Sequence, residues 1–241
     1  MEVRLIDVLG DDLRVVNAAR VSFGKESQWV IDYEKSYKES GVIVDPYVTI
    51  SEKDQKLISY LAKHNHWTPF SHVQITMVEK LPIFVARQRF KHTVGFSYNE
   101  VSRRYVDDTP EFYTPDVWRK RAENKKQGSS DEVVELWPDH GLVSVAGESI
   151  NRSYMNLIAH AEHLYSDMID QGIAPEMARM ILPQAAFTEY YCTGSLAAWA
   201  RAYKLRSDPH AQKEIRDLAD KWNEVISGLP QLKYSWSALV S

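Results

Sequence analysis

Spaced apolar positions or β-prone residues predict β-strands in three parts of the chain. Val3, Leu5 and Val8 indicate an opening strand, and a similar alternation runs from 73 to 77. The segment 185–193 is aromatic and rich in β-prone residues. Successive side chains of a strand point to opposite faces, so such a pattern buries one face of each strand. The sequence therefore predicts three strands that lie far apart in the chain.

Helices are predicted where apolar residues recur every three or four positions behind a capping residue. Ser51 with Asp54 resembles a capping box in front of an apolar stripe, and Ser195 is a candidate helix cap. Glycines and prolines mark the ends of the longer helical patterns. The predicted helices span 11–20, 51–64, 84–92, 154–172, 175–182, 195–206 and 209–228.

The stretch 84–105 contains a dense group of candidate functional residues. Its first part is typical of a basic helix, whose charged side chains leave the apolar face: Arg87, Arg89 and Lys91. Gly95 interrupts this pattern, and Ser97 with Glu100 fits a capping box that starts a new helical turn. Hydroxyl, N–H and guanidinium groups at such a turn would bind a phosphate. A solvated basic surface helix accounts for the same residues equally well.

Composition indicates an ordinary globular protein and argues against two classes. Of 241 residues, 44% are hydrophobic and 26% charged, so the chain can bury a full core. The net charge of −4 argues against a general nucleic-acid-binding protein. No apolar run reaches the ~20 residues that span a bilayer, and the N-terminus lacks a signal-peptide core. The single cysteine fits a reducing compartment, so we expect a cytoplasmic protein, or one of the host cytoplasm if it is viral.

Five blocks of the sequence, in order, resemble the flavin-dependent thymidylate synthase family. The run 98–105 is similar to the end of the family's signature motif. Lys91-His92-Thr93 stands where that family has Arg-His-Arg, with one extra residue before Ser102. The other similar blocks are 18–22, 64–70, 176–183 and 205–212. The segments 24–50 and 121–150 fall outside these blocks, and we predict them to be insertions.

The resemblance implies an α+β fold, with a mixed sheet flanked by long helices in a single compact catalytic domain over 1–241. It also implies reductive methylation of dUMP to dTMP, a step of nucleotide biosynthesis. Methylenetetrahydrofolate would donate the carbon, and FAD reduced by NADPH or NADH would supply the hydride. Members of the family are typically homotetramers with sites between subunits. No nucleic-acid or membrane partner is expected.

The same resemblance assigns roles to individual residues. Arg206 matches the position of a catalytic arginine that would stabilise negative charge on the uracil ring. The residues alone also allow Arg206 to be a helix C-terminal arginine that satisfies carbonyls. The implied dUMP-binding residues are Gln88, Glu100, Ser102, Arg103, Arg104, Arg179 and Arg206. The implied FAD-binding residues are Ser22, Thr68, Lys91, His92, Thr93, Glu100 and Ser195.

Departures from the family pattern affect the predicted flavin contacts. Lys91 can act as a point charge but cannot make the bidentate fork of an arginine, and Thr93 supplies no charge. The run 195–197 stands where family members commonly have Asn-x-Arg. Arg201, one helical turn further on, is our candidate for replacing the lost charge, so we add it to the predicted FAD-binding residues.

Other interpretations of the residues remain open. Cys192 could be a nucleophile, but no histidine or arginine adjacent in sequence would lower its pKa, which favours a small buried residue. A metal could bind at the histidines His64, His66, His72 and His92, but no acidic residue or cysteine completes a standard ligand set nearby, so no metal is expected. A non-catalytic nucleotide-binding relative would keep the phosphate residues while its flavin residues changed.

Overall fold

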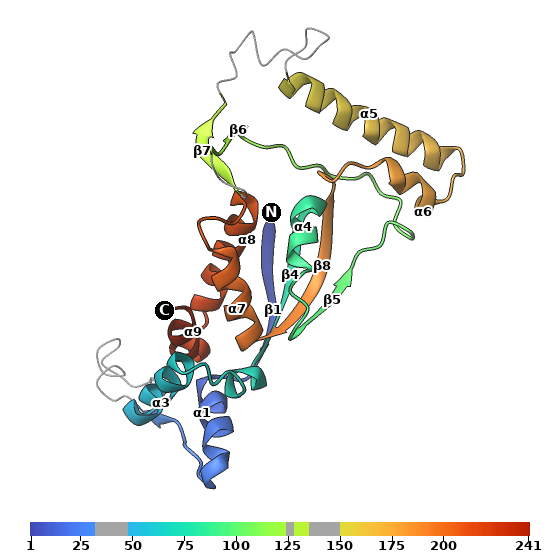
Figure 1. Cartoon of the computed structure of the whole chain (residues 1–241). Coiled ribbons are helices and arrows are strands. Elements are labelled where there is room, and N and C mark those ends of the chain that lie inside the picture. The colour runs from blue at the N-terminus through green and yellow to red at the C-terminus, as the bar shows by residue number, and fades with distance from the viewer. Residues whose placement is uncertain (32–47, 124–127, 135–149) are drawn as a thin grey trace, which may run out of the picture.

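A four-stranded sheet lies at the centre of the computed structural model, which describes residues 1–31, 48–123, 128–134 and 150–241 (Figure 1). The strands are β1 (Glu2–Leu9), β4 (Gln74–Pro82), β5 (Phe96–Glu100) and β8 (Phe187–Ser195), in the order β1-β4-β8-β5. All three neighbouring pairs are antiparallel. The α+β class is confirmed, but the sheet is not mixed, because each strand runs opposite to the neighbour it pairs with.

The alternating apolar positions face the core, as the sequence predicts. Ile75 and Met77 of β4 and Cys192 of β8 have no exposed surface, and Met77 stands opposite Cys192. Between the buried positions of β8, Glu189 and Tyr191 face solvent. The strands predicted near 3–8, 73–77 and 185–193 are therefore confirmed.

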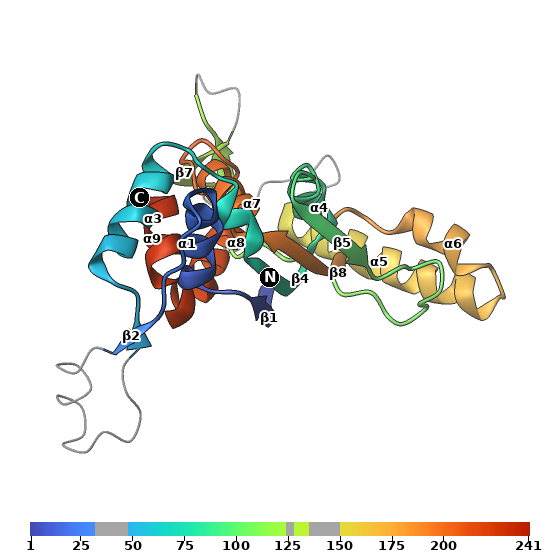
Figure 2. The same ribbon diagram turned by 90° about the horizontal axis from the view of Figure 1, so that it is seen from below.

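Five helices form a cluster beside the sheet, around the buried rings of Trp199, Trp222 and Trp236 (Figure 2). They are α1 (Asp12–Arg20), α3 (Glu52–Lys63), α7 (Leu196–Arg206), α8 (Lys213–Ser227) and α9 (Lys233–Val240). A short helix, α4 (Ile83–Arg89), contacts β4, β8 and α8. The long α5 (Ile150–Asp170) and short α6 (Pro175–Ala178) lie on the other side of the sheet from this cluster (Figures 1 and 2).

Short elements connect these parts. Four 3-10 turns are η1 (Val21–Phe23), η2 (Pro69–His72), η3 (Arg179–Ile181) and η4 (Pro230–Leu232). Two small ribbons pair β2 (Val30–Ile31) with β3 (Val48–Thr49), and β6 (Arg119–Arg121) with β7 (Ser129–Val133). The predicted insertions at 24–50 and 121–150 lie partly outside the described residues and stay a prediction. In the ranges that the structure describes, no helix has the length and hydropathy needed to cross a bilayer.

Three predicted helix starts are confirmed by their caps. Asp11, Ser51 and Ser195 each accept a hydrogen bond from a backbone N–H in the first turn of the helix that follows. The last long helix begins at Lys213 rather than near Pro209, because the Asp208 carboxylate holds the backbone in a turn by accepting from the N–H of His210. The predicted helix 175–182 divides into α6 and η3.

Helix α9 was not predicted, because its cap comes from the other end of the chain. The backbone N–H groups of Tyr234 and Ser235 donate to the carboxylate of Asp12, at 2.9 and 2.8 Å. Burial raises the pKa of Asp12, although these hydrogen bonds act in the opposite direction. A capping residue more than two hundred positions away leaves no local signal at the start of α9.

Two predictions for the stretch 84–105 are wrong. Ser97 and Glu100 do not cap a helical turn, because 96–100 forms β5 and pairs with the edge of β8. Pairing with an available sheet edge outweighs the local capping signal. Arg89 does not leave the apolar face either, because its side chain is fully buried. The charge partner that makes this burial possible lies on β4.

Candidate active site

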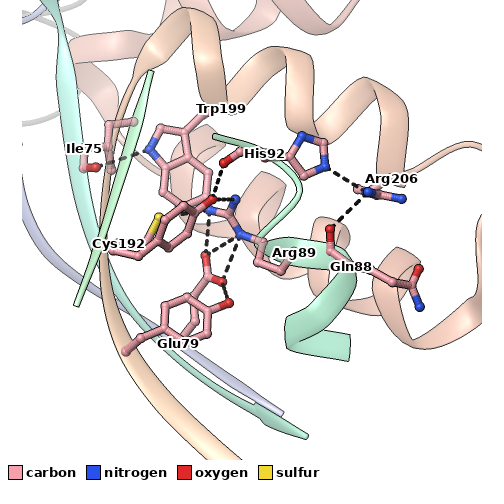
Figure 3. Close-up of polar contacts among 10 residues, drawn as sticks. Ile75, Glu79, Gln88, Arg89, His92, Cys192, Trp199 and Arg206 are labelled. Carbon is pink, nitrogen blue, oxygen red and sulfur yellow. Dashed lines mark hydrogen bonds and ion pairs between the residues drawn. The ribbon is translucent and has the colours of Figure 1, made fainter. Parts of the chain in front are cut away.

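A buried ion pair between Arg89 and Glu79 lies between α4 and the sheet (Figure 3). Both side chains are 0% exposed, and Nε of Arg89 donates to Oε2 of Glu79 at 3.1 Å. The hydroxyl of Tyr190 also donates to Oε2 of Glu79. Burial acts to lower the pKa of Arg89, but the Glu79 carboxylate, together with Cys192, Tyr190 and Tyr98, raises it above its ordinary value, so the guanidinium stays charged. Each charge is thus paired and hydrogen-bonded, which is the condition for tolerating it in the core.

Aromatic rings enclose the same guanidinium. Its central carbon lies 4.4 Å from the ring centroid of Phe96, 5.2 Å from Tyr98, 4.9 Å from Trp199 and 4.6 Å from Trp222. Such contacts are attractive because the faces of aromatic rings carry partial negative charge. The rings leave Arg89 no room to move, so it is a fixed charge beneath the surface.

Arg89, Glu79 and the rings around them form a buried centre, and Cys192 belongs to it. Its Sγ accepts a hydrogen bond from Nη2 of Arg89 at 3.0 Å, so an arginine is adjacent in space although none is adjacent in sequence. Burial nevertheless raises the pKa of the thiol and outweighs the opposing effect of Arg89. The residue is fully buried, as predicted, and a neutral thiol there lacks the character of a nucleophile.

Hydrogen bonds connect the buried centre to Arg206 (Figure 3). Nη1 of Arg89 donates to the hydroxyl of Tyr98 at 2.6 Å, and that hydroxyl donates to the carbonyl of His92 at 2.7 Å. Nε of Arg206 then donates to Nε2 of His92 at 2.8 Å, and its Nη2 donates to the carbonyl of Gln88 at 3.1 Å. The last residue of α7 is thereby joined to α4 and to the loop that follows α4.

The His92 ring is neutral in this arrangement. Burial, together with the positive charges of Arg206, Arg89 and Arg201, lowers the pKa of His92 to about 4. Since Nε2 accepts from Arg206, the ring proton belongs on Nδ1. Burial and the charge of Arg89 also lower the pKa of Arg206, but a guanidinium remains protonated at physiological pH.

The loop 91–95 depends on glycine. Gly95 has φ of +80°, and a Cβ there would lie 2.9 Å from Cβ of Ala198. Its carbonyl accepts from the N–H of Ser195, and Nη2 of Arg201 donates to the carbonyl of Val94. Ser195 and Arg201, both predicted flavin contacts, therefore hold the loop and the start of α7 in this structure. Whether they also contact a flavin stays a prediction.

A cavity of 1080 Å³ lies between η1, α3 and η2. It is lined by two of the predicted flavin residues, Ser22 and Thr68, and by the lysines Lys53 and Lys56. Phe23 and Trp67, also at this cavity, are 79% and 58% exposed. Exposed rings beside cations and hydroxyls are suited to a ligand with an aromatic system and phosphates. The turn η2, which borders this cavity, also contacts α7, the helix that begins after Ser195.

The remaining predicted residues lie in separate places. Lys91 and Thr93 are exposed on the loop after α4, and Glu100 at the end of β5 accepts from the hydroxyl of Thr188 at 2.6 Å. Of the phosphate-binding candidates, Ser102 accepts from Nε of Arg104 at 3.2 Å, Arg103 pairs with Asp108, and Arg179 on η3 is exposed. Among the described residues, hydrogen bonds join Gln88 to Arg206 but neither of them to Ser102, Arg104 or Arg179.

Several residues of this region were not predicted from the sequence to belong to a site. Gln212 accepts from Nε2 of Gln88 and donates to Glu214 at 2.8 Å, and Glu214 pairs with Arg119 at 2.6 Å. Gln212 ends the block 205–212, so the resemblance contained a signal for it. Tyr98 opens the run 98–105, so the resemblance contained a signal for it as well. Glu79 had no such signal, because only the fold brings it to Arg89.

The histidines do not gather into one group. His64 and His66 lie beside Tyr60, with ring centroids 4.3 and 5.9 Å from the tyrosine ring. His92 contacts Arg206 instead. Within the described ranges, no three side chains of histidine, cysteine, aspartate or glutamate are placed to hold a metal ion.

Comparison with known proteins identifies the family. The model of the family described as thymidylate synthase complementing protein matches residues 4–230. The chain belongs to this family. A flavin-dependent thymidylate synthase of Thermosipho melanesiensis is 38% identical over 219 residues, which are 91% of this chain and 82% of the relative. One of Thermus thermophilus is 34% identical over 236 residues, 98% of this chain and 74% of the relative.

A solved structure supports the same conclusion for the fold. The UMP/dUMP methylase PolB of Streptomyces cacaoi, bound with 5-Br dUMP, matches with a TM-score of 0.72 at 26% identity. The match covers 98% of this chain and 93% of that protein. The family resemblance that the sequence motifs predicted is therefore confirmed over most of the chain.

Proposed function

We propose that the chain is an FAD-dependent thymidylate synthase that methylates C5 of dUMP to give dTMP. Methylenetetrahydrofolate is the carbon donor, and NADPH is the reductant. Relatives named flavin-dependent thymidylate synthases, at up to 38% identity over most of the chain, support this proposal. The observation that carries it in the molecule is the position of Arg206, held by two acceptors beside a neutral histidine.

Arg206 is the catalytic residue of this proposal. Its Nε and Nη2 are occupied by His92 and Gln88, and among the described residues Nη1 has no hydrogen-bond partner. Nη1 is therefore available to donate to a pyrimidine oxygen or to N3. As C5 of the base gains electron density to accept the carbon, negative charge develops at those atoms. A fixed guanidinium stabilises that charge without having to reorganise.

The phosphate of dUMP requires the cations and hydroxyls predicted for it. Ser102, Arg104 and Arg179 suit a phosphate chemically. They are spread over the loop after β5 and over η3, away from Arg206 at the end of α7 (Figure 1). This separation supports a homotetramer in which the phosphate residues of one chain complete the site of another.

The cavity bordered by Ser22 and Thr68 fits the FAD that the proposal requires. Lys53 and Lys56 can neutralise a pyrophosphate, and the exposed rings of Phe23 and Trp67 offer surfaces for an aromatic system. When bound, FAD supplies the hydride chemistry that amino-acid side chains cannot perform. The residues of this chain bind and orient the reactants and exclude water. Lys91 and Thr93, where the family has arginines, are expected to weaken the hold on FAD.

The proposal is tested by purification, a visible spectrum and an assay. A yellow protein that oxidises NADPH and forms dTMP only when dUMP and methylenetetrahydrofolate are both present supports it. A colourless protein that binds dUMP without forming dTMP would instead identify the non-catalytic nucleotide-binding relative. UMP belongs in the assay as a second pyrimidine nucleotide, because the solved relative is named a UMP/dUMP methylase. We expect the enzyme to act in the cytoplasm.

A further inference from the structure

The hydrogen bonds from the core to Arg206 form a continuous chain that the proposed reaction does not itself use. We infer that His92 is a positioning residue that fixes the guanidinium of Arg206, and that Tyr98 fixes His92 from the buried centre. This inference rests on the proposed function for its catalytic consequence. The hydrogen bonds themselves are a property of the chain alone.

Two hydrogen bonds position the guanidinium of Arg206. An arginine side chain has several rotatable bonds and is only half-buried here, so its direction is not determined by packing alone. Two acceptors on different elements, Nε2 of His92 and the carbonyl of Gln88, lie 2.8 and 3.1 Å from Nε and Nη2. Two hydrogen bonds to one planar group determine both its position and the orientation of its plane.

His92 lies on a loop and is positioned by a hydrogen bond from Tyr98. Its carbonyl accepts from the Tyr98 hydroxyl, and that hydroxyl accepts from Nη1 of Arg89. Arg89 is itself immobilised by Glu79 and by four aromatic rings. A rigid charge in the core therefore determines where the imidazole stands. Gly95 allows the chain to turn back tightly after His92.

The hydrogen bond from Arg206 requires the His92 ring to be neutral. Only a neutral imidazole can accept from Arg206, because a protonated ring has two donors and no acceptor. The charges that face the ring are those of Arg206, Arg89 and Arg201, all positive, and they disfavour a proton on it. The polypeptide thus supplies an uncharged acceptor next to the catalytic guanidinium, where a carboxylate would neutralise the charge that the reaction needs.

A test compares two substitutions of His92 in the flavin-loaded enzyme. His92→Leu removes the acceptor, whereas His92→Gln keeps one, because the amide oxygen reaches close to the position of Nε2. We expect His92→Leu to lower kcat about 10- to 100-fold, somewhat less than loss of a direct transition-state donor. His92→Gln should recover at least half of that loss on a logarithmic scale. A residue that serves only to fill space would not distinguish the two variants.

A double-mutant cycle shows whether His92 acts through Arg206. In an Arg206→Ala background, His92→Leu should change kcat and the dissociation constant of dUMP less than twofold. If His92 acts only through the flavin, His92→Leu will instead lower kcat and weaken FAD binding equally in both backgrounds. That result, or a failure of His92→Gln to recover activity, would overturn the inference.

Tyr98 has a matched control on the neighbouring strand. Tyr98→Phe removes only the hydroxyl and should lower kcat about tenfold, the loss expected for one hydrogen bond to a positioned group. Tyr191→Phe makes the same chemical change at an exposed ring opposite Asn99 and should leave kcat unchanged. Equal effects of the two substitutions would contradict a role for the Tyr98 hydroxyl.

A readout without substrate separates this inference from the proposed function. Nitrogen-15 NMR of the His92 ring in the folded chain should show an unprotonated Nε2 at neutral pH, with a pKa that rises when Arg206 is replaced by alanine. If the wild-type protein forms no dTMP while this signature is present, the proposed function fails and the contact stands. A ring that titrates identically with and without Arg206 overturns the contact, whatever the enzyme does.

Discussion

The buried centre around Arg89 and the exposed residues around Arg104 represent two ways of presenting a cation. Arg89 is 0% exposed and is fixed by a carboxylate, a hydroxyl, a thiol and four rings. Arg104 is exposed, and its side chain donates to Ser102 and lies over the ring of Tyr105. The first region is complete within one chain. In the second region the charge of Arg104 stays exposed to solvent. Changes in the first region should therefore affect stability, and changes in the second should affect binding.

The largest expected effect is the loss of the buried carboxylate. Glu79→Ala leaves Arg89 charged and unpaired in the core and should lower the free energy of unfolding by about 3–5 kcal/mol. Urea denaturation followed by tryptophan fluorescence measures this. The control is the next residue of β4: Lys80→Ala breaks the exposed pair with Glu111 and should cost less than about 1 kcal/mol. Similar losses for both would show that burial does not distinguish the two pairs.

A smaller effect is expected at the turn after His92. Gly95→Ala combines a positive φ with a Cβ 2.9 Å from Ala198, and should cost about 2–3 kcal/mol of unfolding free energy. Gly24→Ala is the matched control, because its φ is +62° but a Cβ there meets no atom within 4 Å. It should cost only the backbone strain of about 1 kcal/mol. If Gly24→Ala costs as much as Gly95→Ala, close packing around the loop is not what requires glycine.

The neutral His92 predicts a pH dependence of stability. Its pKa is about 4 in the folded chain and returns to the ordinary value of 6.5 on unfolding, so the unfolded state binds the proton more readily. This contribution to stability is present above pH 6.5 and is lost as the pH falls toward 4. Between pH 7 and pH 5 the loss should be about 2 kcal/mol. Urea denaturation at pH 7 and at pH 5 measures this loss of unfolding free energy. The loss should be smaller by this amount in His92→Gln, and an equal loss in both proteins would show that other groups cause it.

The exposed region should respond in binding rather than in stability. Arg104→Ala should leave the free energy of unfolding within about 0.5 kcal/mol. It should weaken dUMP binding about tenfold, because a charged hydrogen bond to phosphate is lost. Calorimetric titration of the flavin-loaded protein with dUMP measures this, and the free nucleoside deoxyuridine, which lacks the phosphate, should bind wild type and variant alike. If Arg104→Ala lowers the free energy of unfolding but leaves dUMP affinity unchanged, Arg104 serves stability and not binding.

The smallest effect is expected at Cys192. Cys192→Ser keeps a hydrogen-bond acceptor of similar size beside Arg89 and should retain turnover within about twofold, because a thiol with a raised pKa is not the nucleophile. Loss of dTMP formation by a folded protein that still binds flavin would show that the thiol takes part in the chemistry. This test separates the proposed reaction from one that proceeds through a covalent bond to the base.

Local patterns of the sequence determined the elements that depend on neighbours along the chain. Strands β1 and β4 follow from spaced apolar positions, and β8 follows from β-prone and aromatic residues. The caps Asp11, Ser51 and Ser195 mark helix starts that the structure confirms. The motif blocks identified the family, and with it the candidate residues, because chemistry at a site restricts residue type as well as position. Gly95 was predicted to adopt an unusual backbone conformation, and its φ is positive.

Only the tertiary structure decided what depends on residues distant in sequence. The run 96–100 became a strand because the edge of β8 was available, and α9 is capped by Asp12 from the opposite end of the chain. Arg89 looked like a surface charge because helical spacing says nothing about a carboxylate on another element. Burial of an ionised group is decided by whether a partner meets it in space, and a linear pattern does not contain that information.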